Sequence, residues 1–321
     1  MSETMVSVER VSKDYGLFSA ISDISFSIAQ GQVVGFLGPN GAGKTTTMKI
    51  ITGFMPPSSG SVTIEGYDLF ENPQLAKKRI GYLPEVPPLY PDMIVREFLR
   101  FAALLRSVER TKLKDSIDRA IEVTGLEPVA DRVIANCSKG YRQRVGIAQA
   151  LVHSPKVLIL DEPTVGLDPV QIVEIRELIK SLSGERTVIL STHILPEVSA
   201  ICERVIMINA GRLVGDGSEE ELSQSIAGSD TYYLAVKGER EKAEKVLKKA
   251  PSVEELEFVK ELDGVLHFRL QGKEVRDPRQ EVSLLLAKEN LPLYELRPPG
   301  LTLEEVFVRL TSGEEEPLKS D

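Results

Sequence analysis

The chain has 321 residues, of which 42% are hydrophobic and 27% charged, and its formal net charge is −9. The composition is ordinary for a globular protein, the length allows two domains, and the acidic balance argues against general affinity for nucleic acid or anionic lipid. Cys137 and Cys202 show no metal or redox spacing, no apolar run is long enough to cross a bilayer, and the first ten residues do not form a signal peptide. We therefore expect a cytosolic protein without disulfides.

Strand and helix patterns alternate through the first two thirds of the chain. Apolar runs predict strands at residues 5–11, 23–28, 32–37, 61–65, 80–83, 157–160, 187–190 and 204–208. Helical periodicity follows the glycine-rich stretch 38–43 as far as residue 51, and recurs at residues 95–105, 111–123, 141–153, 171–182 and 195–201. This alternation predicts a mainly parallel sheet covered by helices.

The pattern changes after Gly215. Strand, helix, strand, strand, helix and strand are predicted in turn at residues 232–236, 239–250, 255–261, 265–270, 278–288 and 292–296. Asp263-Gly264 marks a hairpin between the middle strands, and the whole order is that of a small α+β, ferredoxin-like domain. We place the first domain at residues 1–225 and the second at 226–311, with a last helix at 303–310 and a disordered tail at 312–321.

A phosphate-binding loop is predicted directly after the strand at residues 32–37. Gly38-Pro-Asn-Gly-Ala-Gly-Lys44-Thr45 matches G-x-x-x-x-G-K-[ST] between a strand and a helix, whereas a plain strand-to-helix turn needs no such match. Glycines let backbone N–H groups approach phosphate oxygens, and the helix directs its positive end at the same charge. Lys44 is expected to reach the β- and γ-phosphates, and Thr45 to offer its hydroxyl to Mg²⁺. The candidate nucleotide-binding residues here are Asn40, Gly41, Gly43, Lys44, Thr45 and Thr46.

Two acids, Asp161 and Glu162, follow the buried strand at residues 157–160. Ligands bind at the carboxyl ends of strands in an open parallel sheet. Adjacent acids more often cap a strand at the surface, but a phosphate loop in the same chain favours a catalytic interpretation. Asp161 is then expected to hold the metal, and Glu162 to polarise the attacking water.

These motifs, in this order, resemble the ATP-binding subunits of ABC transporters over about residues 5–217. The resemblance identifies residues 38–46 as the Walker A loop, Asp161 and Glu162 as the Walker B pair, and Gly166-Leu167-Asp168 as the D-loop. It implies an α/β P-loop NTPase fold with a helical subdomain at about residues 86–150. It also implies a Mg²⁺-dependent ATPase.

Four further residues acquire roles through the resemblance. Tyr15 is expected to stack on adenine, and His193, in Ser-Thr-His, to act beside Glu162 as the switch histidine. Ser138 and Gly140 belong to the signature loop, which in this family faces the Walker A loop of a second subunit. In isolation, Tyr15 would more often be a core aromatic, His193 a hydrogen-bonded histidine and Ser138 a helix N-cap.

The signature loop and the Q-loop depart from the family pattern. Three residues differ from the usual Leu-Ser-Gly-Gly-Gln, namely Cys137, Lys139 and Tyr141. Glu85 stands where the Q-loop usually has glutamine, and we predict it to be a metal ligand together with Thr45 and Asp161. These departures and the second domain resemble ATPases that serve ABC-2-type permeases, which are mostly exporters.

The resemblance predicts the ATP-hydrolysing subunit of a membrane exporter, peripheral on the cytoplasmic face of the cell membrane. The expected cofactors are ATP and Mg²⁺, and the expected partners are a second copy of the chain and an integral-membrane permease, without nucleic acid. The alternative is a soluble ABC ATPase acting on a macromolecular assembly such as the ribosome or DNA, which a single uninterrupted cassette and the acidic balance disfavour. A catalytically idle cassette is disfavoured because Lys44, Asp161, Glu162 and His193 are all present.

Overall fold

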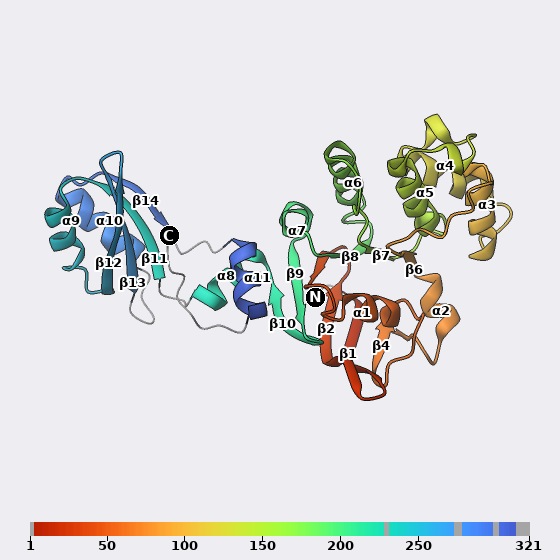
Figure 1. Cartoon of the computed structure of the whole chain (residues 1–321), viewed down its shortest axis with the longest axis horizontal. Helices are drawn as coiled ribbons and strands as arrows, with labels where there is room; N and C mark the ends of the chain where they lie inside the picture. Colours follow the sequence, from red (N-terminus) through yellow and green to blue (C-terminus); the bar gives the residue numbers. More distant parts are fainter. Residues whose placement is uncertain (1–2, 228–230, 273–277, 298–301, 313–321) are drawn as a thin grey trace. The chain divides into compact units, whose positions relative to one another are not determined.

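The computed structural model describes residues 3–227, 231–272, 278–297 and 302–312. These residues form two compact units that divide between Gly217 and Ser218 (Figure 1). The boundary predicted from the sequence lies after residue 225. In the structure α8 (Glu219–Ala227) packs against α11 (Leu303–Ser312) and so belongs to the second unit. Residues 313–321 of the predicted tail lie outside the described residues.

A six-stranded sheet forms the centre of the first unit. Its spatial order is β10 (Arg212–Gly217), β9 (Arg204–Asn209), β3 (Val33–Leu37), β8 (Thr187–Thr192), β7 (Val157–Asp161) and β6 (Ile80–Leu83). Neighbours from β9 to β6 run parallel, and β10 pairs antiparallel with β9. Every residue of β3, β6, β7 and β8 is buried, because helices or other strands cover both faces. The predicted mainly parallel sheet is confirmed.

The N-terminal strands form a separate antiparallel sheet. Its spatial order is β2 (Phe18–Ala29), β1 (Thr4–Tyr15), β4 (Ser59–Ile64) and β5 (Tyr67–Asp68). Its buried face shares one hydrophobic cluster with β3, β9 and α1 (Lys44–Ile51), in which the ring centroids of Phe26 and Phe36 are 5.9 Å apart. The sequence indicated three of these strands but not their separation into a second sheet, because pairing partners are set by tertiary packing.

Helices cover the other face of the six-stranded sheet. α5 (Lys139–Leu151) and α6 (Pro169–Ser181) contribute to one apolar cluster with β7 and β8, and α7 (Leu195–Ile201) follows β8. β6 and α5 approach each other very closely, since a Cβ at Gly81 would collide with the carbonyl oxygen of Ala150. The short α2 (Pro73–Lys78) precedes β6.

A helical subdomain lies between β6 and β7 in the chain. α3 (Val95–Leu105), α4 (Leu113–Thr124) and α5 pack around one apolar cluster that runs from Val95 to Val152. The buried residues of α3 recur at helical spacing, and they include Val95, Phe98, Leu99 and Ala102. This arrangement connects the helical subdomain to the sheet through α5.

The second unit has a core of its own. Its elements after α8 are β11 (Thr231–Lys237), α9 (Arg240–Leu247), β12 (Val253–Leu262), β13 (Val265–Gly272), α10 (Arg279–Lys288), β14 (Leu293–Arg297) and α11. The sheet is antiparallel with the order β12-β13-β11-β14, which is that of the split ferredoxin-like motif. α9 and α10 cover one face, where Leu234, Phe268 and Leu286 are buried together. Asp263 and Gly264 both have positive φ, as a two-residue hairpin turn requires.

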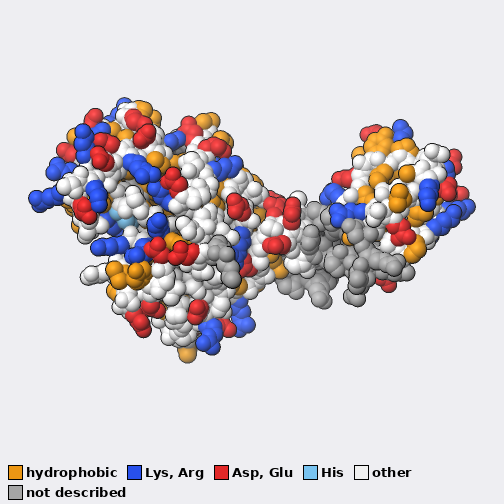
Figure 2. All heavy atoms as spheres, turned by 180° about the vertical axis from the view of Figure 1, so that it is seen from behind, with side chains coloured by type: hydrophobic (Ala, Val, Ile, Leu, Met, Phe, Trp, Pro, Cys, Tyr) orange, Lys and Arg blue, Asp and Glu red, His pale blue; other side chains and the backbone are white. Residues whose placement is uncertain are grey.

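The surface of the first unit carries both signs of charge. Acidic and basic side chains intermingle on the face drawn in Figure 2, and neither sign forms a continuous field there. Within the described ranges, we find no helix with both the length and the apolar character needed to cross a bilayer.

We expect the two units to respond separately to core truncation. Phe36 in β3 and Phe268 in β13 are both fully buried, so Phe36→Ala and Phe268→Ala should each destabilise their own unit by about 3–5 kcal/mol through lost burial and a cavity. Hydrogen-exchange mass spectrometry should show faster exchange around β3 in the first variant and around β13 in the second. Equal acceleration of both units in either variant would contradict two separate cores.

Candidate functional site

A cavity of about 430 Å³ opens at the carboxyl ends of the central parallel strands. Loops that follow β3, β6, β7 and β8 line it, together with the hairpin between β1 and β2. It brings together ten of the residues singled out in the sequence: Tyr15, Asn40, Gly41, Gly43, Lys44, Thr45, Thr46, Glu85, Glu162 and His193. Three residues that sequence reasoning missed also line it: Phe18, Ala20 and Val165. Segments up to 178 positions apart in the chain (from Tyr15 to His193) thus meet at one site.

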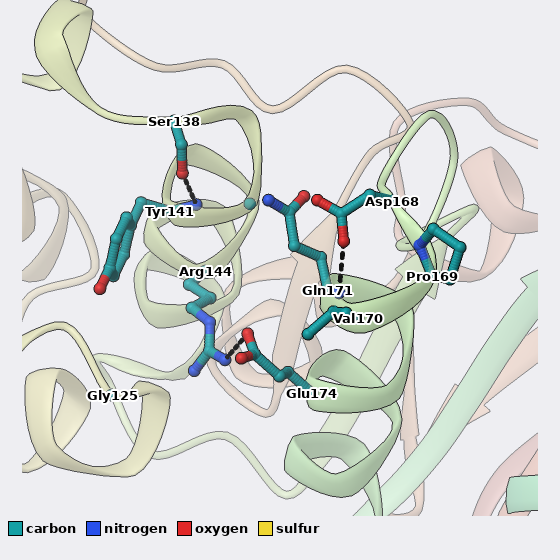
Figure 3. A pocket seen from close by; sticks show the side chains of 10 residues that line it. Gly125, Ser138, Tyr141, Arg144, Asp168, Pro169, Val170, Gln171 and Glu174 are labelled. Carbon is teal, nitrogen blue, oxygen red and sulfur yellow. Dashed lines mark hydrogen bonds and ion pairs between the residues drawn. The ribbon is translucent and has the colours of Figure 1, made fainter.

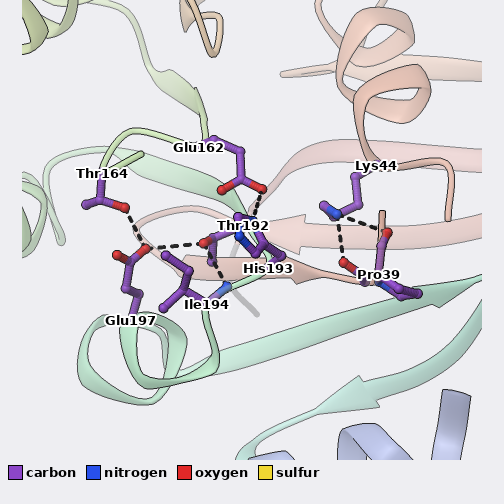
Figure 4. Close-up of polar contacts among 9 residues, drawn as sticks. Pro39, Lys44, Glu162, Thr164, Thr192, His193, Ile194 and Glu197 are labelled. Atoms are coloured by element: carbon purple, nitrogen blue, oxygen red, sulfur yellow. Dashed lines mark hydrogen bonds and ion pairs between the residues drawn. The ribbon is translucent and has the colours of Figure 1, made fainter. Parts of the chain in front are cut away.

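The loop between β3 and α1 wraps one wall of this cavity. Gly41 and Gly43 have φ of 80° and 109°, which glycine adopts without strain. The buried Lys44 donates from Nζ to the carbonyl oxygens of Gly38 at 2.7 Å and Pro39 at 3.1 Å (Figure 4). An ammonium group has three donors, so one remains for a ligand in the cavity.

Two effects act in opposite directions on the pKa of Lys44. Burial lowers the pKa of Lys44 below its usual range, and the negative charges of Glu162, Asp161 and Glu85 counteract that shift. Burial also raises the pKa of Asp161, which is the last residue of β7 and is only 3% exposed. The site therefore holds one cation and three carboxylates close enough to act on its charge.

Glu162 and His193 form a hydrogen-bonded pair (Figure 4). The Nδ1 atom of His193 lies 2.8 Å from Oε1 of Glu162, and in the tautomer with Nδ1–H the imidazole donates to the carboxylate. Glu162 has φ of 48°, an uncommon conformation for a non-glycine residue, and its amide donates to the carbonyl of Ser191 at 2.9 Å. Its Oε2 is buried and has no hydrogen-bond partner among the described residues. No described residue therefore uses the hydrogen-bonding capacity of this oxygen.

Two aromatic rings lie at the hairpin end of the cavity. Tyr15 and Phe18 pair across the two-residue turn between β1 and β2, and both remain largely exposed at 47% and 64%. The hydroxyl of Tyr15 donates to the sulfur of Met55 at 2.9 Å, which holds the ring in place. The Tyr15-Gly-Leu-Phe18 turn was the available sequence signal for Phe18, because a two-residue hairpin puts its flanking residues opposite each other.

Ser138 and Gly140 lie elsewhere, in a second cavity of about 680 Å³ between the starts of α5 and α6 (Figure 3). Ser138 caps α5, since its Oγ accepts the amide of Tyr141 at 3.3 Å. The side chain of Gln171 packs against Gly140. A Cβ added at Gly140 would lie 2.8 Å from the Cδ atom of Gln171. Asp168 caps α6 by accepting the amide of Gln171 at 2.9 Å. The structure therefore separates the signature loop from the phosphate loop within one chain.

The oxygen donors at the first cavity suit Mg²⁺. Thr45 offers a hydroxyl there and Glu85 an exposed carboxylate, whereas the buried Asp161 does not line the cavity but acts electrostatically on Lys44 and Glu85. Among the described residues, no group of three or more His, Cys, Asp or Glu could hold a metal ion alone. Hydroxyl and carboxylate oxygens are ligands that Mg²⁺ accepts in proteins, usually one or two of them together with substrate phosphates.

Comparisons with known proteins agree with this geometry. A family model described as ABC transporter matches residues 21–165. The bacitracin transport ATP-binding protein BcrA of Bacillus licheniformis is 33% identical over 317 residues, which cover 97% of this chain and 98% of that protein. The Nod factor export ATP-binding protein I of Sinorhizobium fredii is 33% identical over 314 residues, which cover 98% and 88%.

A solved structure shows the same similarity. The dimeric post-hydrolysis state of the ATP-binding cassette MJ0796, bound to ADP and Pi, has a TM-score of 0.60 and 25% identity. It matches 67% of this chain and 98% of the other. Sequence similarity to the two relatives, in contrast, extends over nearly the whole chain, including the second unit. The chain belongs to the family of ABC transporter ATP-binding proteins.

Proposed function

We propose that the chain hydrolyses ATP in the 430 Å³ cavity and thereby drives export through an ABC-2-type permease. The observation that supports this most directly is the convergence of the phosphate loop, the Glu162–His193 pair and the Tyr15 ring on one cavity. Phosphate, reactive water and adenine need these three kinds of group in one place. Membership of the family supports ATP as the substrate and Mg²⁺ as its counter-ion.

The proposed roles follow from the contacts. Lys44 binds phosphate with the donor that its own loop leaves free, and the amides of residues 40–46 surround the same charge. Glu162 lines the cavity and accepts a proton from the attacking water, while His193 orients its carboxylate through Oε1. Thr45 and Asp161 hold Mg²⁺, whose charge stabilises negative oxygens on the phosphates. Tyr15, assisted by Phe18, stacks on adenine.

A second copy of the chain completes the site in this proposal. Ser138 and Gly140 line a separate cavity, so they contribute to nucleotide binding only if that cavity faces the phosphate loop of another subunit. The similar cassette MJ0796 is described as a dimer, which supports this arrangement.

Export is proposed from the relatives. One of them is named for bacitracin transport and another for Nod factor export, and both align with this chain over almost its full length. The cytoplasmic face of the membrane is the corresponding location, with the permease supplying the spanning part. The comparisons offer no support for the alternative of a soluble ATPase acting on a macromolecular assembly.

Glu162→Gln should retain ATP binding and lose turnover by at least about 100-fold, because phosphate contacts remain while the general base is removed. The variant should also accumulate an ATP-bound dimer. Steady-state ATPase assays and size-exclusion chromatography with ATP check both results. Turnover at the wild-type rate would exclude Glu162 as the base.

Lys44→Ala should weaken ATP binding by about 10-fold or more, since it removes a charge-assisted contact to phosphate. Lys49→Ala is the matched control, because Lys49 is an exposed lysine on the same helix. Titration with a fluorescent ATP analogue measures both affinities. Equal affinities in the two variants would argue against the phosphate loop.

Glu85→Ala should leave ATP affinity near normal but lower the amount of cargo moved per ATP hydrolysed. Glu85 lies on the connector between β6 and the helical subdomain, so we propose that it transmits the state of the γ-phosphate to the helices. Glu85→Gln should do less harm. Cargo flux and ATPase rate are measured together in vesicles with the cognate permease, with the exposed Glu71→Ala as control. If Glu85→Ala moves as much cargo per ATP hydrolysed as the wild type, Glu85 has no part in coupling.

A further inference from the structure

A buried glutamate connects the loops that carry Glu162 and His193. Glu197, on α7, accepts a hydrogen bond at Oε2 from the hydroxyl of Thr164 at 2.7 Å and another from the hydroxyl of Thr192 at 3.2 Å (Figure 4). Thr164 follows Glu162 by two residues, and Thr192 directly precedes His193. One carboxylate oxygen therefore joins both loops at points adjacent to the reacting pair.

The burial of this glutamate indicates a specific role. Glu197 is only 1% exposed, and its Oε1 is buried without a hydrogen-bond partner among the described residues. The described residues also form no ion pair with Glu197. Burying a carboxylate without a cation costs free energy. Two hydroxyl donors, both on the same oxygen, offset only part of that cost. A pair of apolar residues at this place would stabilise the fold better.

The neighbouring backbone explains what the carboxylate holds. The Oγ1 of Thr192 also accepts a hydrogen bond from the amide of Ile194 at 3.1 Å. Thr192 and Ile194, the residues on either side of His193 in the chain, are thus both held by this hydroxyl, which itself donates to Glu197. Glu162 has an uncommon positive φ of 48°, which persists only where the surroundings restrain it. Thr164 is 2% exposed and anchors the chain just beyond this position.

We propose that Glu197 is a positioning residue for ATP hydrolysis, which ties the Thr164 and Thr192 loops together so that Glu162 and His193 keep their hydrogen bond. The proposal rests on the proposed function, because it concerns the same reaction. Among the described residues the hydrogen bonds of Glu197 go to the two threonines and not to the pair, so it acts through those threonines. Nucleotide binding depends on the phosphate loop and Tyr15, which Glu197 does not contact, so its effect should fall on kcat and not on affinity.

The test compares two substitutions of Glu197 with one of Glu203. Glu197→Met keeps the volume but removes the acceptor, and should lower kcat by about 10- to 100-fold with the KM for ATP within twofold, as expected for a misplaced catalytic group. Glu197→Gln retains an oxygen that accepts both hydroxyls, and should keep kcat within about threefold of wild type. Glu203→Met is the matched control, because Glu203 is exposed and lies just beyond the end of α7. It should leave kcat unchanged.

A second readout needs neither nucleotide nor turnover. The chain has three histidines, so nitrogen-15 NMR of the imidazole groups can resolve His193, with assignment by His193→Gln. The Nδ1 resonance should be the same in wild type, Glu197→Gln and Glu203→Met, and should shift in Glu197→Met as the bond to Glu162 is lost. A purely structural role would lower Tm in Glu197→Met but leave kcat and this resonance unchanged, and that result overturns the proposal.

The threonines keep the test decisive if Glu197→Met does not fold. Thr164→Val and Thr192→Val each remove one hydroxyl while conserving shape, and each should lower kcat. Adding Thr164→Val to a folded Glu197→Met should cause little further loss, because the contact is already absent. Wild-type kcat in both valine variants overturns the proposal. Comparison with Glu162→Gln separates the outcomes: if that variant also turns over normally, the proposed function itself fails.

Discussion

The parallel pairing of β7 with β8 is the constraint on which the site depends. Asp161 stands opposite Ser191 in the register, and the next amide, that of Glu162, donates to the Ser191 carbonyl. Alternate side chains of both strands pack into two different apolar clusters, so a slip of one residue would move each side chain into the wrong cluster. The register is therefore fixed by the core, and it delivers Glu162 and His193 to the same edge of the sheet.

From this edge one segment of chain reaches both cavities. Glu162 and Val165 line the first cavity, whereas Asp168 and Gln171 line the second. Between them Gly166 lies against Lys139 of the signature loop, where any Cβ would collide with the lysine Nζ. Residues between 162 and 171 thus contribute to both cavities. Because the second cavity is proposed to serve another subunit, this segment is a physical link between two sites in a dimer.

The sequence was most informative where the relevant pattern is local. The phosphate loop, the acid pair and the alternation of strands and helices are each encoded within a few consecutive residues, and the fold confirms the mainly parallel sheet. Sequence reasoning missed Phe18, which becomes relevant only through pairing with Tyr15, and Glu197, whose partner Thr164 is 33 positions away. It also missed α2, β10 and α8, because a six-residue helix, a strand with two glycines and a helix rich in Glu and Ser carry weak periodicity.

Charge balance at the first cavity explains why the reaction needs a divalent cation. Glu85, Asp161 and Glu162 all act on Lys44, and burial already disfavours its charged form. A triphosphate adds several negative charges at the same place, where partial burial weakens the screening by water. One ammonium cannot offset this repulsion. A divalent cation would offset part of it, and in the proposed site the hydroxyl of Thr45 and the carboxylate of Asp161 are oxygen ligands of the kind that Mg²⁺ prefers.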